Sequence, residues 1–241
     1  MTDPVIRRLS PKAHGDHPPF TYRDYRSTVL RAPQKDLVRI VNTLSETTGP
    51  GPAISEIAAE DADLTTNAGT RAEAIGQRTI VTGRVLDQNG DSVAGTLVEI
   101  WQANAAGRYA HWRDGESSAP IDPNFLGMGQ TVTDAEGVYR FTTIKPGPYP
   151  WGNHPNAWRP SHIHFSLMGT GLGSRLVTQM YFEGDPMLGL DPIFNAVPEH
   201  SRSRMIATYD HSVTEEGWAT GYRWDIVIRG VLATPTEAEA S

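Results

Sequence analysis

The pattern of hydrophobic and polar positions changes near residue 79. From there, short runs rich in β-branched and aromatic residues alternate between apolar and polar positions, and clusters of Gly, Pro, Asn and Asp separate them. The runs that we predict as strands are 79–86, 96–102, 131–143 (strand, turn, strand), 162–167, 176–182, 204–209 and 223–229. Many short strands joined by turns predict a mainly β protein with a β-sandwich core and long irregular loops.

The chain before residue 79 has a different composition. Residues 1–34 are polar, contain prolines and show no periodicity, which predicts an N-terminal arm that packs on the core and on a partner. Apolar positions recur at helical spacing in 36–44, so one short helix is predicted there. The tail at 233–241 is rich in Ala, Glu and Thr and is predicted to be disordered. The expected division is therefore 1–78, 79–232 and 233–241.

Composition excludes several classes of protein. The 241 residues carry a formal charge of -7, which argues against nucleic acid and anionic membranes as partners. Cysteine is absent, which excludes thiolate metal sites, iron–sulfur clusters and a cysteine nucleophile. No apolar run approaches the ~20 residues of a membrane span, and the first residues show no secretory signal. We therefore expect a cytoplasmic protein.

The segment His162-Ile163-His164 is the first candidate for chemistry. On a strand the side chains alternate, so both imidazoles point to one face, about 7 Å apart along the backbone, and Ile163 points into apolar packing. One metal ion can bridge two histidines at that spacing. Taken alone, the same pattern equally fits two polar histidines on a solvated strand face.

The surroundings favour a particular metal. Phe165 to Gly169 contains neither the Asp and His of a zinc hydrolase nor the Glu of a cupin-like iron site. The nearby oxygen donors are Tyr109 and Tyr149. Tyrosine has a pKa of about 10, so its ionisation near neutral pH needs a strongly charged cation such as ferric iron. A tyrosine by itself more often packs in a core or interface. Together the four residues indicate a non-haem Fe(III) site, with one ion per chain.

Longer segments carry a family resemblance. The chain resembles the intradiol ring-cleavage dioxygenases over roughly residues 22–230, with the most specific match at 97–186. The matching segments are 24–28 (DYRST), 45–50 (SETTGP), 97–104 (LVEIWQAN), 107–109 (GRY), 143–151 (TIKPGPYPW), 158–165 (WRPSHIHF) and 181–186 (YFEGDP).

The resemblance implies a reaction and roles for named residues. It implies that Tyr109, Tyr149, His162 and His164 bind Fe(III), and that a catechol is cleaved between its hydroxyl-bearing carbons with both atoms of dioxygen. It also implies that Tyr149 leaves the metal when the substrate binds. Arg159 is then expected to stabilise negative charge on the substrate, although an arginine usually forms a surface ion pair. The proline-rich run 146–160 is expected to hold Tyr149 rigidly without a regular strand ladder.

Further positions match the family's substrate pocket. These are Tyr25, Trp101, Trp151, Gln179 and Ile193. Each of them could instead serve only in packing. The other tryptophans considered, Trp112, Trp218 and Trp224, are expected in the core.

Within the family, the match favours the type that cleaves protocatechuate (3,4-dihydroxybenzoate) to 3-carboxy-cis,cis-muconate in the β-ketoadipate pathway of aromatic catabolism. The resemblance implies pairing with a homologous α chain that lacks the ligands, and assembly of α–β units into larger oligomers. Catechol or hydroxyquinol 1,2-dioxygenase is the alternative, but those enzymes carry a larger helical N-terminal region. A transthyretin-like binding module without a metal is the remaining alternative, because fold alone does not decide function.

Overall fold

The computed structural model describes residues 17–18, 57–114, 117–152, 155–169, 172 and 175–237. The helix expected at 36–44, most of the expected arm and Tyr25 lie outside these residues. Of the region before the first strand, Leu64 is buried in the core and its backbone N–H donates to Thr142 O at 2.9 Å.

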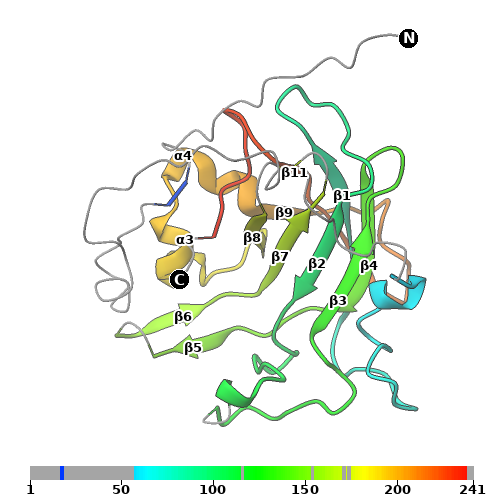
Figure 1. Cartoon of the computed structure of the whole chain (residues 1–241). Helices are drawn as coiled ribbons and strands as arrows, with labels where there is room; N and C mark the ends of the chain where they lie inside the picture. Colours follow the sequence, from blue (N-terminus) through cyan, green and yellow to red (C-terminus); the bar gives the residue numbers. More distant parts are fainter. Residues whose placement is uncertain are drawn as a thin grey trace.

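Strands dominate the described residues, which confirms a mainly β fold (Figure 1). The strands are β1 (Arg78–Leu86), β2 (Leu97–Trp101), β3 (Met128–Val132), β4 (Val138–Ile144), β5 (Tyr149–Trp151), β6 (Ala157–Arg159), β7 (His162–Met168), β8 (Leu176–Phe182), β9 (Ile206–Tyr209), β10 (Thr220–Arg223) and β11 (Ile226–Val227). The helices are α3 (Pro192–Ala196) and α4 (Glu199–Arg202), with short 3-10 turns at Ala59–Ala62, Trp112–Asp114, Leu188–Leu190 and Ser203–Met205. No helix among the described residues is long and apolar enough to cross a membrane.

The strands form one large sheet and one small one. The large sheet has nine strands: eight are hydrogen-bonded in the order β11-β1-β10-β9-β8-β7-β2-β3, and the ninth, β4, pairs with β1. A separate two-stranded sheet consists of β5 and β6. The large sheet is mainly antiparallel, but β1 pairs in parallel with β10 and β11, and β8 pairs in parallel with β9.

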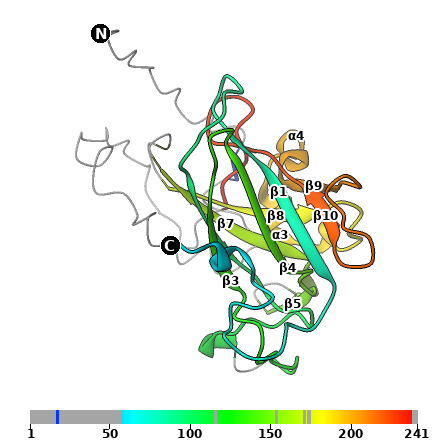
Figure 2. The same ribbon diagram turned by 90° about the vertical axis from the view of Figure 1, so that its right-hand side faces the viewer.

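The core lies between the two halves of the large sheet (Figures 1 and 2). Phe165 of β7 packs edge to face on Tyr139 and Phe141 of β4, with ring centroids 5.9 and 5.8 Å apart. Trp224, which follows β10, contacts the same Phe165 at 4.9 Å. The halves β4-β1-β10-β9 and β8-β7-β2-β3 therefore face each other as the layers of a sandwich do, although hydrogen bonds join them into one sheet.

Most strand predictions match the structure within a few residues. The run predicted at 223–229 is divided into β10 and β11, which pair with different stretches of β1. The prediction that 146–160 forms no ladder is wrong, because β5 and β6 pair there in antiparallel register. The helices α3 and α4 were not predicted, because each has five residues or fewer and shows no helical periodicity.

The predicted tail and two of the tryptophans need correction. Residues 233–237 pack on the domain, and Thr234 is only 2% exposed, while 238–241 lie outside the described residues. Trp224 is buried as expected, but Trp112 and Trp218 are exposed. The Trp218 ring instead lies under the Arg78 guanidinium at 4.6 Å, a contact that needs no burial.

Candidate metal centre and its cavity

The inner strand β7 positions both histidines. His162 and His164 point to the face of β7 opposite the core, and Ile163 between them is fully buried in the core, as the alternation predicts. Because β2 and β8 pair on either side, the backbone of β7 is held along both edges.

Neighbouring strands place partners beside each histidine. His164 lies opposite Trp101 of β2 and Gln179 of β8, and His162 lies opposite Tyr181 of β8. The Trp101 and His164 rings are stacked, with centroids 4.9 Å apart and an interplanar angle of 8°. The rings of His162 and Tyr181 lie 5.9 Å apart.

The small sheet carries Tyr149 and Arg159. In the β5–β6 hairpin these two residues are directly opposite each other, and Tyr149 Oη lies 3.4 Å from His162 Nε2. A proline at position 150 is tolerated, because a two-stranded sheet consists only of edge strands.

The loop after β2 brings Tyr109 to the same place. Asn104 Oδ1 accepts hydrogen bonds from the backbone N–H groups of Ala106 and Arg108, at 2.9 and 3.0 Å. Gly107 has φ of 79°, and a Cβ there would collide with the carbonyl oxygen of Pro148. This close backbone approach requires glycine and fixes the Tyr109 loop against the residue that precedes Tyr149.

The four predicted ligands meet at their polar atoms. Tyr109 Oη lies 3.1 Å from His164 Nε2 and 3.4 Å from His162 Nε2, and Tyr149 Oη also lies 3.4 Å from His162 Nε2. The two tyrosine rings are edge to face at 5.7 Å. Two phenol oxygens and two imidazole nitrogens thus converge on one point.

The far nitrogen of each imidazole is occupied. His162 Nδ1 donates to Pro160 O at 2.7 Å, and His164 Nδ1 donates to Glu237 Oε2 at 3.1 Å. A carbonyl or carboxylate oxygen can only accept, so Nδ1 carries the proton in both rings. In the neutral ring, Nε2 is then the nitrogen with the lone pair, and it faces the phenol oxygens.

Burial controls the ionisation of this cluster. Burial raises the pKa of Tyr109, and the neighbouring Tyr149 raises it further, while Arg159 opposes the rise. Burial also raises the pKa of Tyr149, against Arg159. Burial lowers the pKa of His162 well below its usual value, and Arg159 lowers it further. Without a bound cation, the phenols are therefore protonated and His162 is neutral at neutral pH.

This donor set fits ferric iron. Two neutral imidazoles and two phenols have no net charge, and loss of both phenol protons would compensate two of the three charges of Fe(III). Imidazole nitrogen and phenolate oxygen both suit iron. The described residues contain no group of three or more His, Asp and Glu that could hold a metal ion.

Arg159 belongs to a buried polar network beside the ligands. Its Nε lies 3.1 Å from Asp191 Oδ1, and its Nη2 bonds to Gln179 Oε1. Tyr181 Oη lies 3.0 Å from Asp191 Oδ2 and 2.8 Å from Gln179 Oε1, so it can donate to either and links the two partners of Arg159. Burial alone would lower the pKa of Arg159, but Asp191 holds it well above the usual value, so the guanidinium is a fixed positive charge.

A cavity of about 560 Å³ opens at the cluster. Its walls include both tyrosines, His164, Arg159, Trp101 and Trp151. The Arg159 guanidinium lies 5.7 Å from the centre of the Trp151 ring. The volume suits a small aromatic ligand with one polar, cationic wall.

Two other predicted pocket residues lie behind this wall. Gln179 is fully buried and touches Arg159. Ile193 lies in α3, where its N–H donates to the capping carboxylate of Asp191 at 2.9 Å. Neither residue is among those that line the cavity.

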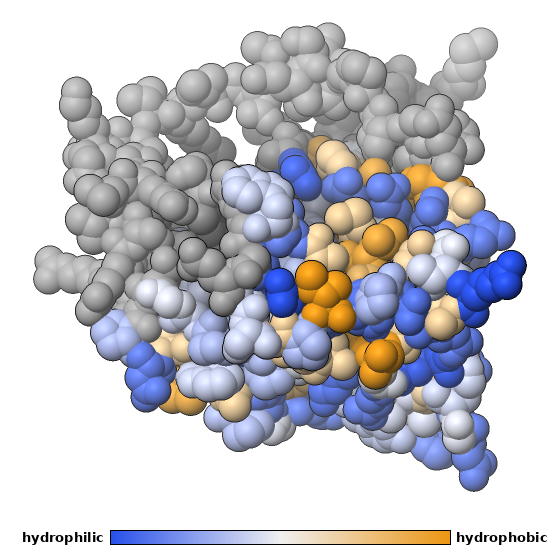
Figure 3. All heavy atoms as spheres, turned by 90° about the horizontal axis from the view of Figure 1, so that it is seen from below, coloured by the Kyte–Doolittle hydropathy of each residue, from blue (hydrophilic) through white to orange (hydrophobic). Residues whose placement is uncertain are grey.

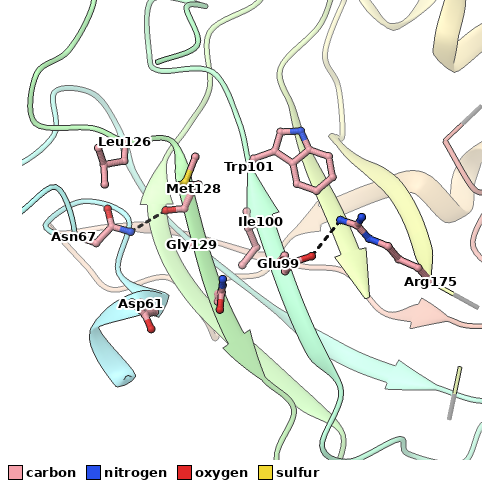
Figure 4. A pocket seen from close by; sticks show the side chains of 10 residues that line it. Asp61, Asn67, Glu99, Ile100, Trp101, Leu126, Met128, Gly129 and Arg175 are labelled. Carbon is pink, nitrogen blue, oxygen red and sulfur yellow. Dashed lines mark hydrogen bonds and ion pairs between the residues drawn. The ribbon is translucent and has the colours of Figure 1, made fainter. Parts of the chain in front are cut away.

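A second cavity of about 470 Å³ adjoins the first at Trp101 (Figure 4). Arg175 there pairs with Glu99 at 3.2 Å, and Asn67 Nδ2 donates to Met128 O at 2.8 Å. None of the four predicted ligands lines it, and it shares Trp101, Leu126 and Met128 with the first cavity.

Sequence reasoning missed three residues of the site. Tyr181 follows Gln179 by two positions on one strand, so alternation alone could have placed it on the same face. Asp191 stands before Pro192, a recognisable helix-start signal. Glu237 lies in the Ala-, Glu- and Thr-rich tail, where no sequence pattern indicates that it belongs to the site.

Comparisons with known proteins identify relatives over most of the chain. Residues 50–230 match the family described as Dioxygenase, and residues 11–43 match the N-terminal region of the protocatechuate 3,4-dioxygenase beta subunit. The chain is 54% identical to the protocatechuate 3,4-dioxygenase beta chain of Burkholderia cepacia, over 98% of this chain and all of that one. It is 27% identical to the alpha chain of the same organism, over 64% of this chain and 74% of that one. The structure of 3-chlorocatechol 1,2-dioxygenase from Rhodococcus opacus 1CP matches with a TM-score of 0.55 and 28% identity, covering 73% of this chain and 67% of that one.

Proposed function

Because this chain belongs to the intradiol ring-cleavage dioxygenase family, we propose that it cleaves protocatechuate with dioxygen to 3-carboxy-cis,cis-muconate. The observation that carries the proposal is the convergence of two phenol oxygens and two imidazole Nε2 atoms within 3.1–3.4 Å at the end of a cavity. Both atoms of dioxygen enter the product, so the reaction needs no external reductant.

The family uses non-haem iron. In the proposal, Tyr109, Tyr149, His162 and His164 hold one ferric ion per chain. When bound, that ion supplies the Lewis acidity that makes a chelated catechol reactive toward dioxygen. Nε2 is the nitrogen of each histidine that would bind the ion, because Nδ1 is already a hydrogen-bond donor to oxygen.

Tyr149 has the additional role of a base. Tyr149 borders the cavity at the cluster and also a third cavity, of about 730 Å³, beside Pro150 and Trp158. We assign to its Oη the acceptance of one catechol proton as the substrate enters, which frees the phenol to turn away from the ligand cluster.

Arg159 is proposed to stabilise negative charge on the substrate. Its guanidinium is buried, is fixed by Asp191 and lies in the cavity wall, so it stabilises negative charge that develops on the substrate ring. Trp101 and Trp151 form apolar walls that orient the ring and exclude water. Behind this wall, Gln179 holds Arg159, and Ile193 and Tyr25 are proposed as further substrate-pocket residues.

The proposed partner is a homologous α chain, in oligomers of α–β units. Leu126 and Met128 line the cavity mouth and are 46% and 58% exposed, and Figure 3 shows hydrophobic side chains exposed among polar ones on the lower face. A partner that covers this mouth would shield them from water. The arm within 1–78 is proposed to pack on the core and on that partner.

The visible absorption spectrum is the decisive test. We expect the chain, purified with its α partner, to show a broad phenolate-to-iron charge-transfer band that shifts when protocatechuate is added without oxygen. Oxygen uptake with protocatechuate, catechol and hydroxyquinol then tests the substrate. Faster uptake with catechol would contradict the protocatechuate assignment. A colourless protein that contains iron would contradict the tyrosine ligands.

A further inference from the structure

The imidazole of His164 is held from the far end of the chain. Its Nδ1 lies 3.1 Å from Glu237 Oε2, and the two residues are 73 positions apart in the sequence. The side chains are 10% and 19% exposed, so little water competes for this contact. His162 differs, because its Nδ1 bonds to the carbonyl of Pro160, only two residues away.

Several hydrogen bonds deliver Glu237 to this position. Its own N–H donates to Val177 O at 2.8 Å, and Thr178 Oγ1 donates to Pro235 O at 2.7 Å. Thr234 N–H donates to Val227 O at 2.8 Å. Thr234 thus contacts β11 and residues 235–237 lie along the start of β8, whereas β9 pairs with β8 only at its other end.

Stacking on Trp101 does not determine which of two flipped orientations the His164 ring adopts. The rings are nearly parallel, at 8°, so stacking fixes the plane of the imidazole. A rotation of 180° about the Cβ–Cγ bond preserves that plane, but it exchanges Nδ1 with Cδ2 and Nε2 with Cε1. Stacking therefore cannot decide whether nitrogen or carbon faces Tyr109.

The Glu237 carboxylate selects one of the two ring orientations. It accepts a hydrogen bond from Nδ1–H, whereas the rotated ring would present a C–H group to it. With the observed orientation, Nε2 faces Tyr109 Oη at 3.1 Å. A carboxylate behind a ligating imidazole also raises the basicity of the metal-facing nitrogen.

We propose that Glu237 is a positioning residue that fixes the orientation and the tautomer of His164 for metal binding, so that the C-terminal segment is part of the metal centre. The inference rests on the proposed function, because it assumes that His164 binds the ion. Loss of such an outer partner weakens metal binding by about 10–100-fold.

The test compares Glu237→Gln, Glu237→Asp and Glu237→Ala with the unchanged protein, each purified with the α chain. The variant Glu239→Gln is the matched control, because it makes the same charge change two residues later in the tail. The measurements are iron per chain, the rate of iron loss to excess EDTA, and the position of the charge-transfer band. Thermal melting of the iron-free proteins reports on folding separately.

We expect iron loss to be about 10–100-fold faster in Glu237→Ala. Glu237→Gln should lie between, since its amide oxygen still accepts the hydrogen bond without the charge, and Glu239→Gln should match the unchanged protein. The charge-transfer band should shift in Glu237→Ala. If Glu237→Ala melts early, Glu237→Gln decides the question through the same rate and band. Unchanged iron loss and an unchanged band in both variants would overturn the role of Glu237 alone. An unchanged protein that binds no iron would overturn the proposed function as well.

Discussion

His162 and His164 lie on β7, an inner strand of a nine-stranded sheet, whereas Tyr109 and Tyr149 lie on segments outside that sheet. The histidines have strand neighbours on both sides, and an oxygen atom holds each Nδ1. The tyrosines depend on a loop and a two-stranded hairpin that touch at Gly107 and Pro148. The half of the site that must stay in place is built on the rigid sheet, and the half that is proposed to move is not.

Arg159 connects the two halves. It lies opposite Tyr149 in the hairpin, but its guanidinium reaches across to Gln179 of β8 and to Asp191. Its position therefore depends on both regions, and the substrate charge that it is proposed to stabilise develops between them.

The largest expected effect on iron binding comes from replacing a histidine of β7. In His162→Ala, we expect iron binding to weaken by more than the about 10–100-fold that an outer partner contributes, with loss of the coloured band. Iron per chain after dialysis measures this. The control is His211→Ala, which changes an exposed histidine. Iron binding equal to that of the unchanged protein would remove His162 from the ligand set.

The second-largest expected effect is the loss of turnover in a variant of Arg159, which connects the two regions. Arg159→Ala should retain iron and its colour while kcat falls by about 10²–10³-fold, the range for losing one preorganised electrostatic contact. Because the variant leaves Asp191 buried without its partner, at a cost of about 3–5 kcal/mol, the double variant Arg159→Ala/Asp191→Asn should recover stability without recovering kcat. Arg175→Ala, which breaks the more exposed pair with Glu99, is the control. Full turnover in Arg159→Ala would refute its role.

The two tyrosines should behave differently from each other. Tyr149→Phe removes the proposed proton acceptor, so we expect a loss of kcat of about 100-fold with iron still bound. Tyr109→Phe should mainly weaken iron binding, because Tyr109 Oη approaches both histidines. Stopped-flow absorbance and iron per chain separate these results, and Tyr209→Phe serves as an exposed control. Identical behaviour of Tyr109→Phe and Tyr149→Phe would argue against a distinct role for Tyr149.

The smallest expected effect concerns the contact between the two tyrosine segments. Gly107→Ala should lower the free energy of unfolding by about 1–3 kcal/mol, because the positive φ and the collision with Pro148 O both oppose a Cβ. Thermal melting measures the effect. Gly184→Ala isolates the cost of the positive φ, because Gly184 has a similar φ but open space around it. Gly189→Ala is the control, because Gly189 has neither a positive φ nor an atom close to the added Cβ. Equal melting temperatures for Gly107→Ala and Gly189→Ala would contradict the contact.

The sequence predicted the sheet half of the site better than the tyrosine half. Alternation within 162–167 placed both histidines on one face and Ile163 in the core, because that property is local to one strand. The β5–β6 hairpin was not predicted, since its proline-rich strands have three residues each and carry no alternation to detect.

By itself, the sequence determined the mainly β fold, the positions of most strands and which four side chains to expect together at one site. These depend on short-range periodicity and on the chemistry of single side chains. Only the tertiary structure decided that Asp191 holds Arg159 and that Glu237 holds His164. Such pairs join residues 32 and 73 positions apart, and no local pattern records a contact that exists only after the chain has packed.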